Sequence, residues 1–284
     1  MILIGDSGST STSWCLIPLN EEGEKIFFST EGYNPYFVTQ DYIIESLRKN
    51  LPKKYDWDLV QKVGFYGAGC SENKYDFIRD SLKVIFKNAD IDVAMDLLAA
   101  ARALLGTESG FAAILGTGTN SCIYDGESIV QNIDSLGFIL GDEGSGAYIG
   151  KRLLRDFLRG DMPQEIERLF IDKYNTSNDQ FFENVYEKPF ANKYCASFCL
   201  FIYQHLDNYP WLENLVKDSF RELFRNIITK YPYYKNYKFN CIGSIAFHFK
   251  NTLADVCTEF GMPIGIILQS PIDGLIDYYK KMAE

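Results

Sequence analysis

Short apolar runs alternate with longer amphipathic segments along the first hundred residues of the chain. The runs at residues 1–4 and 13–17 flank a stretch of Gly, Ser, Thr and Asp, which predicts two strands joined by a small-residue loop. Two more strands are predicted at residues 25–29 and 63–66. Apolar residues also recur with the period of a helix, which predicts helices at residues 41–50, 74–88 and 97–105.

The same arrangement starts again after residue 106. Strands predicted at residues 111–115 and 121–124 enclose a second loop of small residues, and helical periods dominate residues 147–230. The last elements are predicted in this order: a strand at residues 238–242, a helix at 245–260, a strand at 265–268 and an amphipathic segment at 271–282.

This repetition divides the chain into two blocks, residues 1–106 and residues 107–270, and a terminal helix near residues 271–284 is expected to pack back on the first block. A chain of 284 residues is close to the size at which one hydrophobic core divides into two. Strand pairs interleaved with helices predict an α/β fold with a duplicated domain, and the cleft between the copies is the natural ligand site.

The charge of the chain narrows the class of ligand. With 28 Lys and Arg against 38 Asp and Glu, the net charge is −10. Nucleic acids and anionic membranes are bound through Lys and Arg, so neither partner is expected and the ligand is predicted to be small. His205 and His248 are the only His residues, and neither stands in a zinc-binding or triad spacing. Carboxylates are therefore expected to carry the chemistry.

The seven Cys residues include no Cys-x-x-Cys pair, and several lie inside apolar runs. This pattern is typical of reduced intracellular thiols packed as small apolar side chains. The first residues lack a signal-peptide pattern, and no apolar run reaches 18 residues. A soluble, cytoplasmic protein is therefore expected.

Two loops have the composition of phosphate-binding loops. In residues 5–12 and 116–120, small side chains would let backbone N–H groups approach an anion, and hydroxyls add further donors. Asp6, at the end of the first strand, could hold a hydrated Mg²⁺. A tight hairpin turn explains the first loop equally well. The second loop lacks the third Gly of a dinucleotide-binding fingerprint, and the chain has no P-loop sequence.

Three further positions combine Gly or a carboxylate with the start of a predicted helix. Residues 136–146 hold adjacent carboxylates in a Gly-rich bend, Gly243 and Ser244 form a strand-to-helix turn, and Asp96 stands between a strand-like run and a helix. Helix capping explains each carboxylate on its own, although a helix N-terminus also favours an ionised carboxylate.

Taken together and in this order, these segments resemble the actin-like sugar kinase superfamily, and more closely the N-acetylglucosamine kinase and BadF/BadG/BcrA/BcrD ATPase family. The resemblance covers nearly the whole chain: residues 5–12 resemble the first phosphate loop, residues 116–120 the second, residues 137–145 the family's Gly-Asp-Glu-Gly-Ser segment, and Gly243-Ser244 the adenosine-side turn. It implies two ribonuclease-H-like (actin-like ATPase) domains with ATP, Mg²⁺ and an amino sugar in the cleft between them.

The resemblance also implies roles for individual residues. Asp96 would be the catalytic base, and Asp6 would hold Mg²⁺ through water. The residues that would bind the sugar are Asn34, Leu136, Gly137, Asp142 and Glu143. The residues that would bind the nucleotide are Gly8, Ser9, Thr10, Gly116, Thr117, Gly118, Thr119, Gly243 and Ser244.

The implied function is ATP-dependent phosphorylation of the 6-hydroxyl of a hexosamine by in-line phosphoryl transfer. Ser11 stands where many relatives carry Lys or Arg, and Leu136 and Phe138 replace the aromatic and polar residues found around Gly137. The acyl pocket is therefore expected to differ in shape. Glucosamine and N-acetylmuramic acid stand beside N-acetylglucosamine as candidate substrates.

Two other functions remain open from the sequence. One is an ATPase that activates a partner enzyme through an Fe–S cluster held by Cys thiolates at a dimer interface. Cys195 and Cys199 lie one helical turn apart, but buried thiols of one helix explain this pair more simply. The other is a non-catalytic sugar sensor that uses the same cleft. A homodimer is the default expectation for the oligomeric state.

Overall fold

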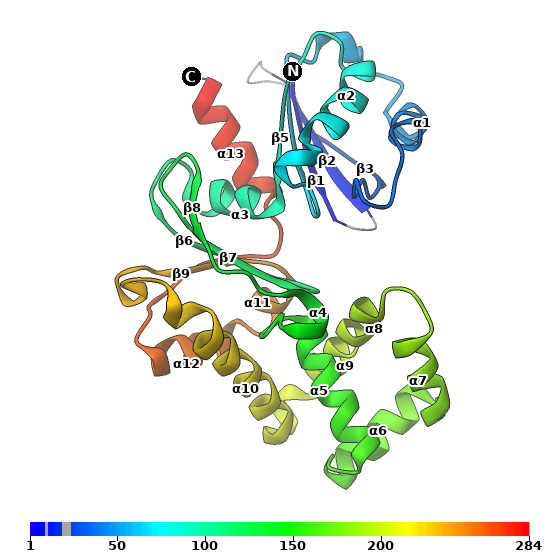
Figure 1. The fold of residues 1–284 in the computed structure, drawn as a ribbon, viewed down its shortest axis with the longest axis vertical. Coiled ribbons are helices and arrows are strands. Elements are labelled where there is room, and N and C mark those ends of the chain that lie inside the picture. The colour runs from blue at the N-terminus through cyan, green and yellow to red at the C-terminus, as the bar shows by residue number, and fades with distance from the viewer. Residues whose placement is uncertain (9–10, 19–23, 284) are drawn as a thin grey trace. The chain divides into compact units, whose positions relative to one another are not determined.

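The computed structural model describes residues 1–8, 11–18 and 24–283, and the chain divides into two compact units. Unit 1 consists of Met1–Glu108, Gly126–Ser128 and Pro271–Glu284, and unit 2 consists of Ser109–Asp125 and Ile129–Ser270. The C-terminal segment therefore belongs with the N-terminal half of the chain (Figure 1).

Unit 1 is built on a five-stranded sheet with the order β3-β2-β1-β4-β5. Its strands are β1 (Ile2–Ser7), β2 (Ser11–Ile17), β3 (Ile26–Glu31), β4 (Lys62–Gly67) and β5 (Asp90–Met95). Strands β1, β4 and β5 run parallel, whereas β2 pairs antiparallel with both β1 and β3. The carboxyl ends of β1, β4 and β5 consequently meet at one edge of the sheet.

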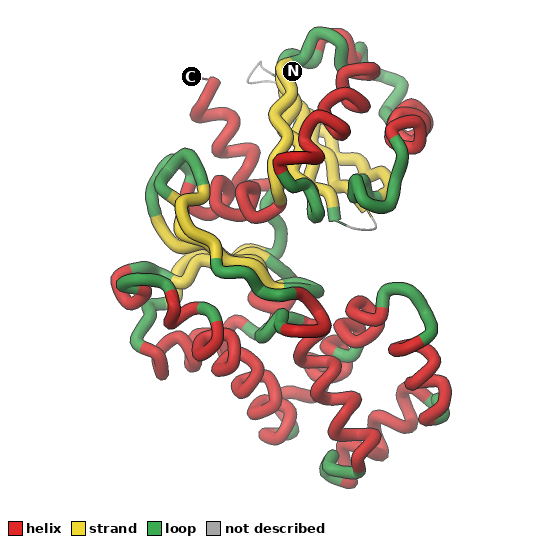
Figure 2. The backbone as a smooth tube through the Cα atoms, viewed as in Figure 1, coloured by secondary structure: helices red, strands yellow, loops and turns green. Residues whose placement is uncertain are grey.

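Helices cover both faces of this sheet (Figure 2). They are α1 (Gln40–Asn50), α2 (Tyr75–Ile85), α3 (Asp96–Leu105) and α13 (Ile272–Ala283). Leu3, Trp14 and Phe65 belong to the core shared with α1 and α2, whereas Ile4 and Tyr66 belong to the core shared with α3 and α13. Because successive side chains point to opposite faces of a strand, a sheet buried on both faces needs continuous apolar runs.

The C-terminal helix α13 packs against α3 and β1. Its Tyr279 hydroxyl lies 2.8 Å from the hydroxyl of Tyr66, which also accepts a hydrogen bond of 2.8 Å from Arg102. Gly64 leaves room for this contact, since a Cβ atom there would lie 2.1 Å from the Tyr279 hydroxyl. A buried polar network therefore fixes α13 on unit 1.

Unit 2 contains a second five-stranded sheet, with the order β10-β9-β6-β7-β8. Its strands are β6 (Gly110–Leu115), β7 (Thr119–Tyr124), β8 (Ile129–Asn132), β9 (Phe239–Ile242) and β10 (Ile264–Leu268). Strand β6 pairs antiparallel with β7 and parallel with β9, as β1 pairs with β2 and β4. The predicted α/β fold with duplicated ribonuclease-H-like domains is confirmed.

Most of unit 2 outside its sheet is helical. The helices are α4 (Gly137–Leu140), α5 (Gly146–Arg159), α6 (Gln164–Tyr174), α7 (Asn178–Tyr186), α8 (Ala191–Ser197), α9 (Cys199–His205), α10 (Pro210–Asn226), α11 (Ser244–His248) and α12 (Lys250–Phe260). Short 3₁₀ turns complete the described structure: η1 (Trp57–Leu59), η2 (Glu72–Lys74), η3 (Leu206–Asn208), η4 (Ile228–Lys230) and η5 (Tyr234–Asn236).

Helices break at two buried aromatic residues where the sequence predicts continuous helical periods. The predicted helix at residues 245–260 is divided into α11 and α12, which meet at Phe249, and within residues 147–230 the helices α8 and α9 meet at Phe198. Both Phe side chains are buried in the core of unit 2. A helical period in the sequence reports burial on one face, and it does not reveal a change of axis at a buried aromatic residue.

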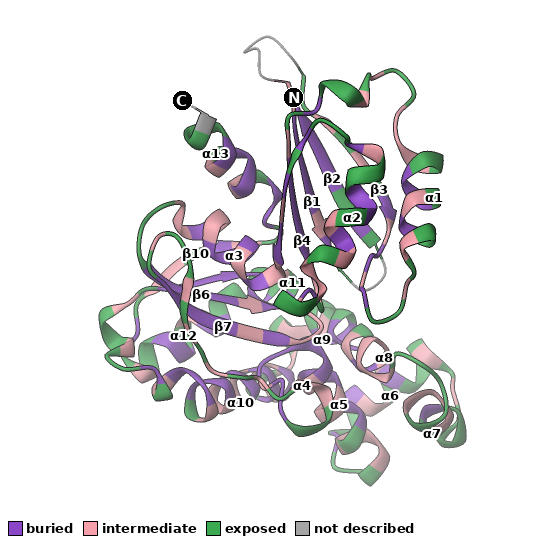
Figure 3. Cartoon of the chain, turned by 45° about the horizontal axis from the view of Figure 1, so that its top comes forward, coloured by how far each residue is buried: buried purple, intermediate pink, exposed green. Residues whose placement is uncertain are grey.

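Buried positions concentrate in the strands, and exposed positions on the outer faces of the helices (Figure 3). Among the described residues no helix is both long and apolar enough to span a bilayer.

Candidate active site

The first group of candidate residues lies where β1, β4 and β5 end. Asp6 is the penultimate residue of β1, the segment 68–70 follows β4, and Asp96 follows β5 as the first residue of α3. Parallel pairing sets Asp6 opposite Tyr66, and Gly67 opposite Met95. In open α/β sheets, ligands bind outside the carboxyl ends of the strands, so this edge is the natural site in unit 1.

Asp96 is a half-buried carboxylate at a helix N-terminus. Burial raises its pKa, and hydrogen bonds from the backbone N–H groups of Leu97 and Asp96 itself lower the pKa by less. The charge of Asp96, after burial, also raises the pKa of the Cys70 thiol, to about 12. A carboxylate with a raised pKa is a better proton acceptor than an exposed one, as a general base requires.

Asp6 lies close enough to Asp96 for the two charges to interact. Burial, followed by repulsion from Asp96, raises the pKa of Asp6 to about 6. A divalent cation beside this pair would offset the repulsion, and Mg²⁺ prefers such oxygen ligands. Among the described residues no group of three or more His, Cys, Asp and Glu is placed to hold a metal. These residues therefore fit a Mg²⁺ ion that would be held by one carboxylate together with waters and substrate phosphates.

Ser7, the last residue of β1, connects strand β2 and two loops at this edge. Its hydroxyl accepts a hydrogen bond of 3.0 Å from the Tyr33 amide and lies 2.8 Å from the hydroxyl of Thr12. Its carbonyl accepts a hydrogen bond of 2.8 Å from the Ala68 amide. The loop after β3, which carries Asn34, is thereby held at the end of β1.

Asn34 is half-buried and packs against the loop that follows β4. Its side-chain oxygen accepts a hydrogen bond of 3.0 Å from the Tyr36 amide. A Cβ atom on Gly69 would lie 2.8 Å from the Asn34 side-chain nitrogen, and Gly69 has a φ of +78°. Gly69 is a site residue that the sequence reasoning missed. The Gly-Ala-Gly run after a predicted strand was the signal that could have found it.

The first small-residue loop is closed at its base, where the Gly8 amide donates a hydrogen bond of 2.9 Å to the carbonyl of Ser11. Gly8 is exposed. Ser9 and Thr10, which were predicted to bind phosphate, lie outside the described residues. Their predicted role stays a prediction.

The second small-residue loop joins β6 to β7 in unit 2, and its shape is fixed by hydrogen bonds. The Gly116 amide donates to the Gly118 carbonyl over 3.0 Å. The Gly146 amide, at the start of α5, donates to the Gly116 carbonyl over 2.8 Å, and the next amide, that of Ala147, donates to the Thr117 carbonyl over 3.1 Å. Gly116, Thr117 and Gly118 are half-buried.

Asp142 and Glu143 form hydrogen bonds with Thr119, the residue that follows this loop. The Thr119 amide donates to the carboxylate of Asp142 over 3.1 Å, and the Thr119 hydroxyl donates to the carbonyl of Glu143 over 2.8 Å. The Glu143 carboxylate accepts a hydrogen bond of 2.9 Å from Asn226. Burial raises the pKa of Asp142 more than its hydrogen bonds lower it. The structure thus shows a supporting role for both residues, and their binding of sugar stays a prediction.

Leu136 and Gly137 begin the short helix α4 with positive φ values of 60° and 68°. The Leu136 side chain is 60% exposed. Lys151 of α5 fixes this segment, because its ammonium donates a hydrogen bond of 2.8 Å to the Phe138 carbonyl and lies 4.8 Å from the centre of the Phe138 ring. The segment is therefore an anchored, exposed surface next to Asp142.

Gly243 and Ser244 form the turn between β9 and α11. Gly243 has a φ of 129°, and a Cβ atom there would lie 2.2 Å from the Leu115 carbonyl oxygen and 3.1 Å from the Gly116 nitrogen. Ser244 is exposed. The structure therefore brings the second loop and this turn together at the carboxyl ends of β6 and β9, and their binding of nucleotide stays a prediction.

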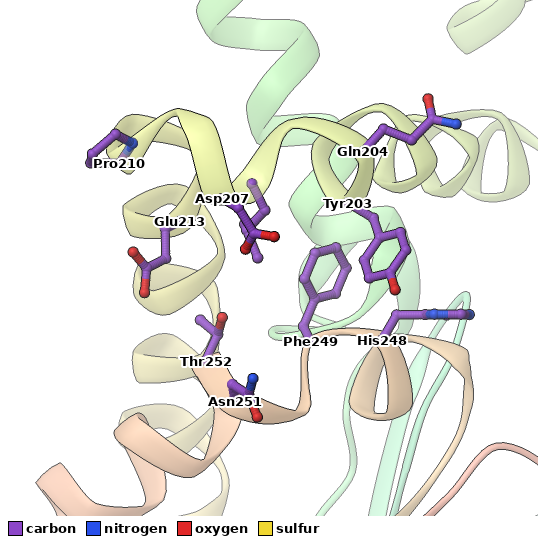
Figure 4. A pocket seen from close by; sticks show the side chains of 10 residues that line it. Tyr203, Gln204, Asp207, Pro210, Glu213, His248, Phe249, Asn251 and Thr252 are labelled. Carbon is purple, nitrogen blue, oxygen red and sulfur yellow. The ribbon is translucent and has the colours of Figure 1, made fainter.

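A cavity of about 710 Å³ lies at the other end of α11. Figure 4 shows Tyr203 and His248 side by side along one wall and Asp207 and Asn251 on other walls. The ring centres of Tyr203 and His248 are 4.9 Å apart. These residues could not be grouped from the sequence, because they come from α9, η3, α11 and α12 and form no motif.

Cys195 and Cys199 are both buried in unit 2. Burial raises the pKa of Cys195 to about 11 and that of Cys199 to about 12. Both thiols are therefore protonated at neutral pH, whereas an Fe–S cluster is held by thiolates.

Several solved structures are similar to the chain over its whole length. One is the crystal structure of a putative N-acetylglucosamine kinase from Porphyromonas gingivalis. Its sequence is 40% identical to that of the chain, the TM-score is 0.93, and the match covers 100% of both chains. The chain is 15% identical to a second protein of that description, from Chromobacterium violaceum, with a TM-score of 0.69 and 98% of both chains covered.

A third similar structure is a ROK family glucokinase from Streptomyces griseus in complex with glucose and AMPPNP. It is 16% identical to the chain, with a TM-score of 0.57, and the match covers 98% of this chain and 97% of the glucokinase. At such identities the second and third structures support the fold alone. No family model and no curated protein matches the chain.

Proposed function

The chain belongs to the actin-like sugar kinase superfamily, and on this premise we propose that it transfers a phosphoryl group from ATP to the 6-hydroxyl of a hexosamine. The observation that carries the proposal is the pair formed by Asp6 and Asp96, two interacting carboxylates at the carboxyl edge of the unit 1 sheet. One of them is at the head of a helix, and both have raised pKa values.

Asp96 acts as the base in the proposed reaction. A sugar hydroxyl must lose its proton as it attacks the phosphoryl group, and a carboxylate within hydrogen-bond reach can accept that proton. Asp6 holds Mg²⁺ through water. Mg²⁺ bound there supplies neutralising charge for the transferred phosphoryl group. Backbone N–H groups of the Gly-rich loops contribute further stabilisation of the same charge.

The proposed acceptor is an amino sugar, N-acetylglucosamine or a close relative. Asn34 offers side-chain hydrogen bonds to sugar hydroxyls, and the absence of a side chain at Gly69 lets Asn34 pack closely on the loop after β4. Leu136 and Gly137 offer an exposed surface to an acyl substituent, with Asp142 next to them. The name of the Porphyromonas gingivalis protein supports this class of substrate.

The proposed donor is ATP, with its phosphates at Gly116–Gly118 and the Gly243-Ser244 turn of unit 2. Half-buried Gly and Thr residues allow close approach by an anion, which an acidic chain cannot attract by net charge. The cavity beyond α11 is the proposed base pocket, because Tyr203 and His248 offer aromatic surface to a planar ring. The glucokinase solved with AMPPNP supports a nucleotide as donor.

A panel assay tests the proposed function. The protein is incubated with Mg-ATP and, in turn, N-acetylglucosamine, glucosamine, N-acetylmuramic acid and glucose, and ADP release is followed. At least one amino sugar is expected to stimulate ADP release and to gain the mass of one phosphoryl group. The 6-deoxy analogue of the best substrate is the matched control, and it should give only the background rate.

Each other outcome has a definite meaning. ADP release that no sugar stimulates would favour the ATPase alternative, and binding of a sugar that is recovered unchanged would favour the sensor. Equal stimulation by the 6-deoxy analogue would exclude the 6-hydroxyl as the acceptor.

A further inference from the structure

A second cavity, of about 380 Å³, lies in unit 2 between α5, α7 and α8. Leu154, Leu158, Phe181 and Val185 line it, together with the buried thiol of Cys195. Its volume lies within the range of small-molecule sites, which are mostly apolar with a few polar groups that orient the ligand. None of these lining residues belongs to the proposed sugar or nucleotide site.

Three cationic side chains also line this cavity. Lys151, Arg155 and Arg159 follow one another at intervals of four along α5, so they lie on one face of that helix. Arg155 is paired with the neighbouring Asp156 over 2.7 Å, whereas Arg159 is exposed and forms no ion pair within the described part of the chain. Such a row of positive charge beside an apolar cavity stands out in a chain with a net charge of −10.

The opposite wall of the cavity carries exposed aromatic side chains. Phe182 is 49% and Tyr186 79% exposed, and their rings are stacked with centres 6.2 Å apart. Both belong to α7 and line the same cavity as Val185. Apolar side chains gathered in this way at a cavity mouth indicate a surface that another molecule covers.

We propose that this cavity binds a small anion with an apolar body, of the class of medium-chain aliphatic carboxylates. Arg159 pairs with the carboxylate, since guanidinium and carboxylate groups form two parallel hydrogen bonds. The aliphatic body packs on Leu154, Leu158 and Val185 and is covered by Phe182 and Tyr186. Charge complementarity selects an anion, and the apolar lining selects against small inorganic anions.

The position of Lys151 links this site to the segment that begins α4. Its ammonium lines the cavity and also donates to the Phe138 carbonyl over 2.8 Å. Lys151 lies about two helical turns from Arg159, so a carboxylate paired with Arg159 leaves this hydrogen bond intact.

Isothermal titration calorimetry of the full chain with octanoate tests the proposal. We expect one saturable site per chain. Octan-1-ol, which keeps the body but not the charge, and acetate, which keeps the charge but not the body, should each bind about tenfold more weakly or worse. Absence of octanoate binding, or equal binding of octan-1-ol, would overturn the proposal. The measurement needs neither ATP nor sugar, so it is independent of the proposed kinase activity.

Variants locate the site. Arg159→Glu should weaken octanoate binding about tenfold or more, and Val185→Trp should fill the cavity and abolish binding. Arg168→Glu, on the exposed face of α6 outside the cavity, is the matched control and should bind octanoate as the unchanged protein does. If Arg159→Glu and Val185→Trp instead bind octanoate normally, the cavity is not the site. The oligomeric state is measured by sedimentation at the same time. If the unchanged protein is a dimer with and without octanoate, and the two variants are monomers, a second copy of the chain occupies the cavity and the proposal fails.

Discussion

The two sheets share one strand order but differ in the chemistry at the carboxyl ends of their parallel strands. In unit 1 this edge holds Asp6 and Asp96, half-buried carboxylates with raised pKa values. In unit 2 the corresponding turns, residues 116–118 and 243–244, contain only Gly, Thr and Ser. The turns themselves therefore present carboxylates in one copy and backbone with hydroxyls in the other, where the carboxylate of Asp142 lies beside the loop and accepts a hydrogen bond from the Thr119 amide.

This difference suits the two copies to different parts of the proposed reaction. Burial raises the pKa of both carboxylates and the charge of Asp96 raises that of Asp6 further, so the unit 1 edge favours a bound cation or proton. Two such carboxylates side by side would repel polyphosphate. The unit 2 edge instead consists of small residues that an anion could approach closely. Hydrogen bonds from the amides of Gly146 and Ala147 already fix their conformation.

The largest expected effect comes from removing the charge at the head of α3. Asp96→Asn should lower kcat for the sugar by about a thousandfold, because the acceptor hydroxyl loses its base. Nucleotide binding should be kept, since Asp96 is not among the groups proposed to bind the nucleotide. Steady-state kinetics and a nucleotide titration measure the two properties separately.

The control for this variant is Asp90→Asn, an exposed carboxylate at the opposite end of the same strand β5, which should leave kcat unchanged. Turnover retained by Asp96→Asn would remove Asp96 from the role of base. Loss of nucleotide binding together with turnover would show that the two edges do not divide the work as argued.

A smaller but still large effect is expected where β9 turns into α11. In Gly243→Ala the new Cβ atom would lie 2.2 Å from the Leu115 carbonyl, in a backbone with φ of 129°. We expect a loss of about 3 kcal/mol in the free energy of unfolding and weaker binding of nucleotide, because the Gly116 loop must move. Urea denaturation and nucleotide titration provide the measurements.

Gly160→Ala separates backbone strain from close contact. Gly160 also has a positive φ, of 75°, but a Cβ atom there would have no neighbour within 4 Å. Its substitution should be less destabilising and should leave nucleotide binding intact. If both variants lose the same free energy of unfolding, the close approach of residue 243 to Leu115 is not the cause of the loss.

The contrast between the two edges was partly visible in the sequence. Asp6 and Asp96 could be placed at strand ends because apolar runs stop next to them, and the small-residue loops repeat at the start of each half. The pairing of Gly69 with Asn34 could not be predicted, because it depends on how two loops 35 positions apart meet in space. The Tyr203 and His248 wall depends in the same way on where α9 ends relative to α11.

A third, still smaller effect concerns stability and pH. The pKa of Asp6 rises from an ordinary value of 3.8 to about 6 in the folded protein, so its ionised form destabilises the fold. This destabilisation is fully present above about pH 6 and disappears as the pH falls through 6 toward 3.8. A rise of about two pKa units corresponds to about 3 kcal/mol, and this is reduced because Asp6 is only half-buried, so Asp6→Asn should raise the free energy of unfolding by about 1–2 kcal/mol at pH 8, and the gain should shrink toward pH 4.

Thermal unfolding at pH 4, 6 and 8 without Mg²⁺ measures this gain, which corresponds to a rise of a few degrees in Tm. Asp90→Asn, which removes an exposed carboxylate from the same unit, should show no such gain. An Asp6→Asn variant less stable than the unchanged protein at pH 8 would show that the carboxylate supports the fold rather than straining it.

The smallest effect is expected at the cavity beyond α11, where unit 2 offers aromatic surface instead of hydrogen-bonding backbone. Tyr203→Ala removes one of the two rings that line this wall, and stacking of a base on one ring is worth about 1 kcal/mol. We therefore expect about a fivefold rise in the KM for ATP with kcat nearly unchanged. Tyr233→Ala, which removes an 81% exposed ring outside the cavity, is the matched control. Equal KM values for both variants would place the base elsewhere, and would leave the backbone turns at Gly116 and Gly243 as the whole contribution of unit 2 to nucleotide binding.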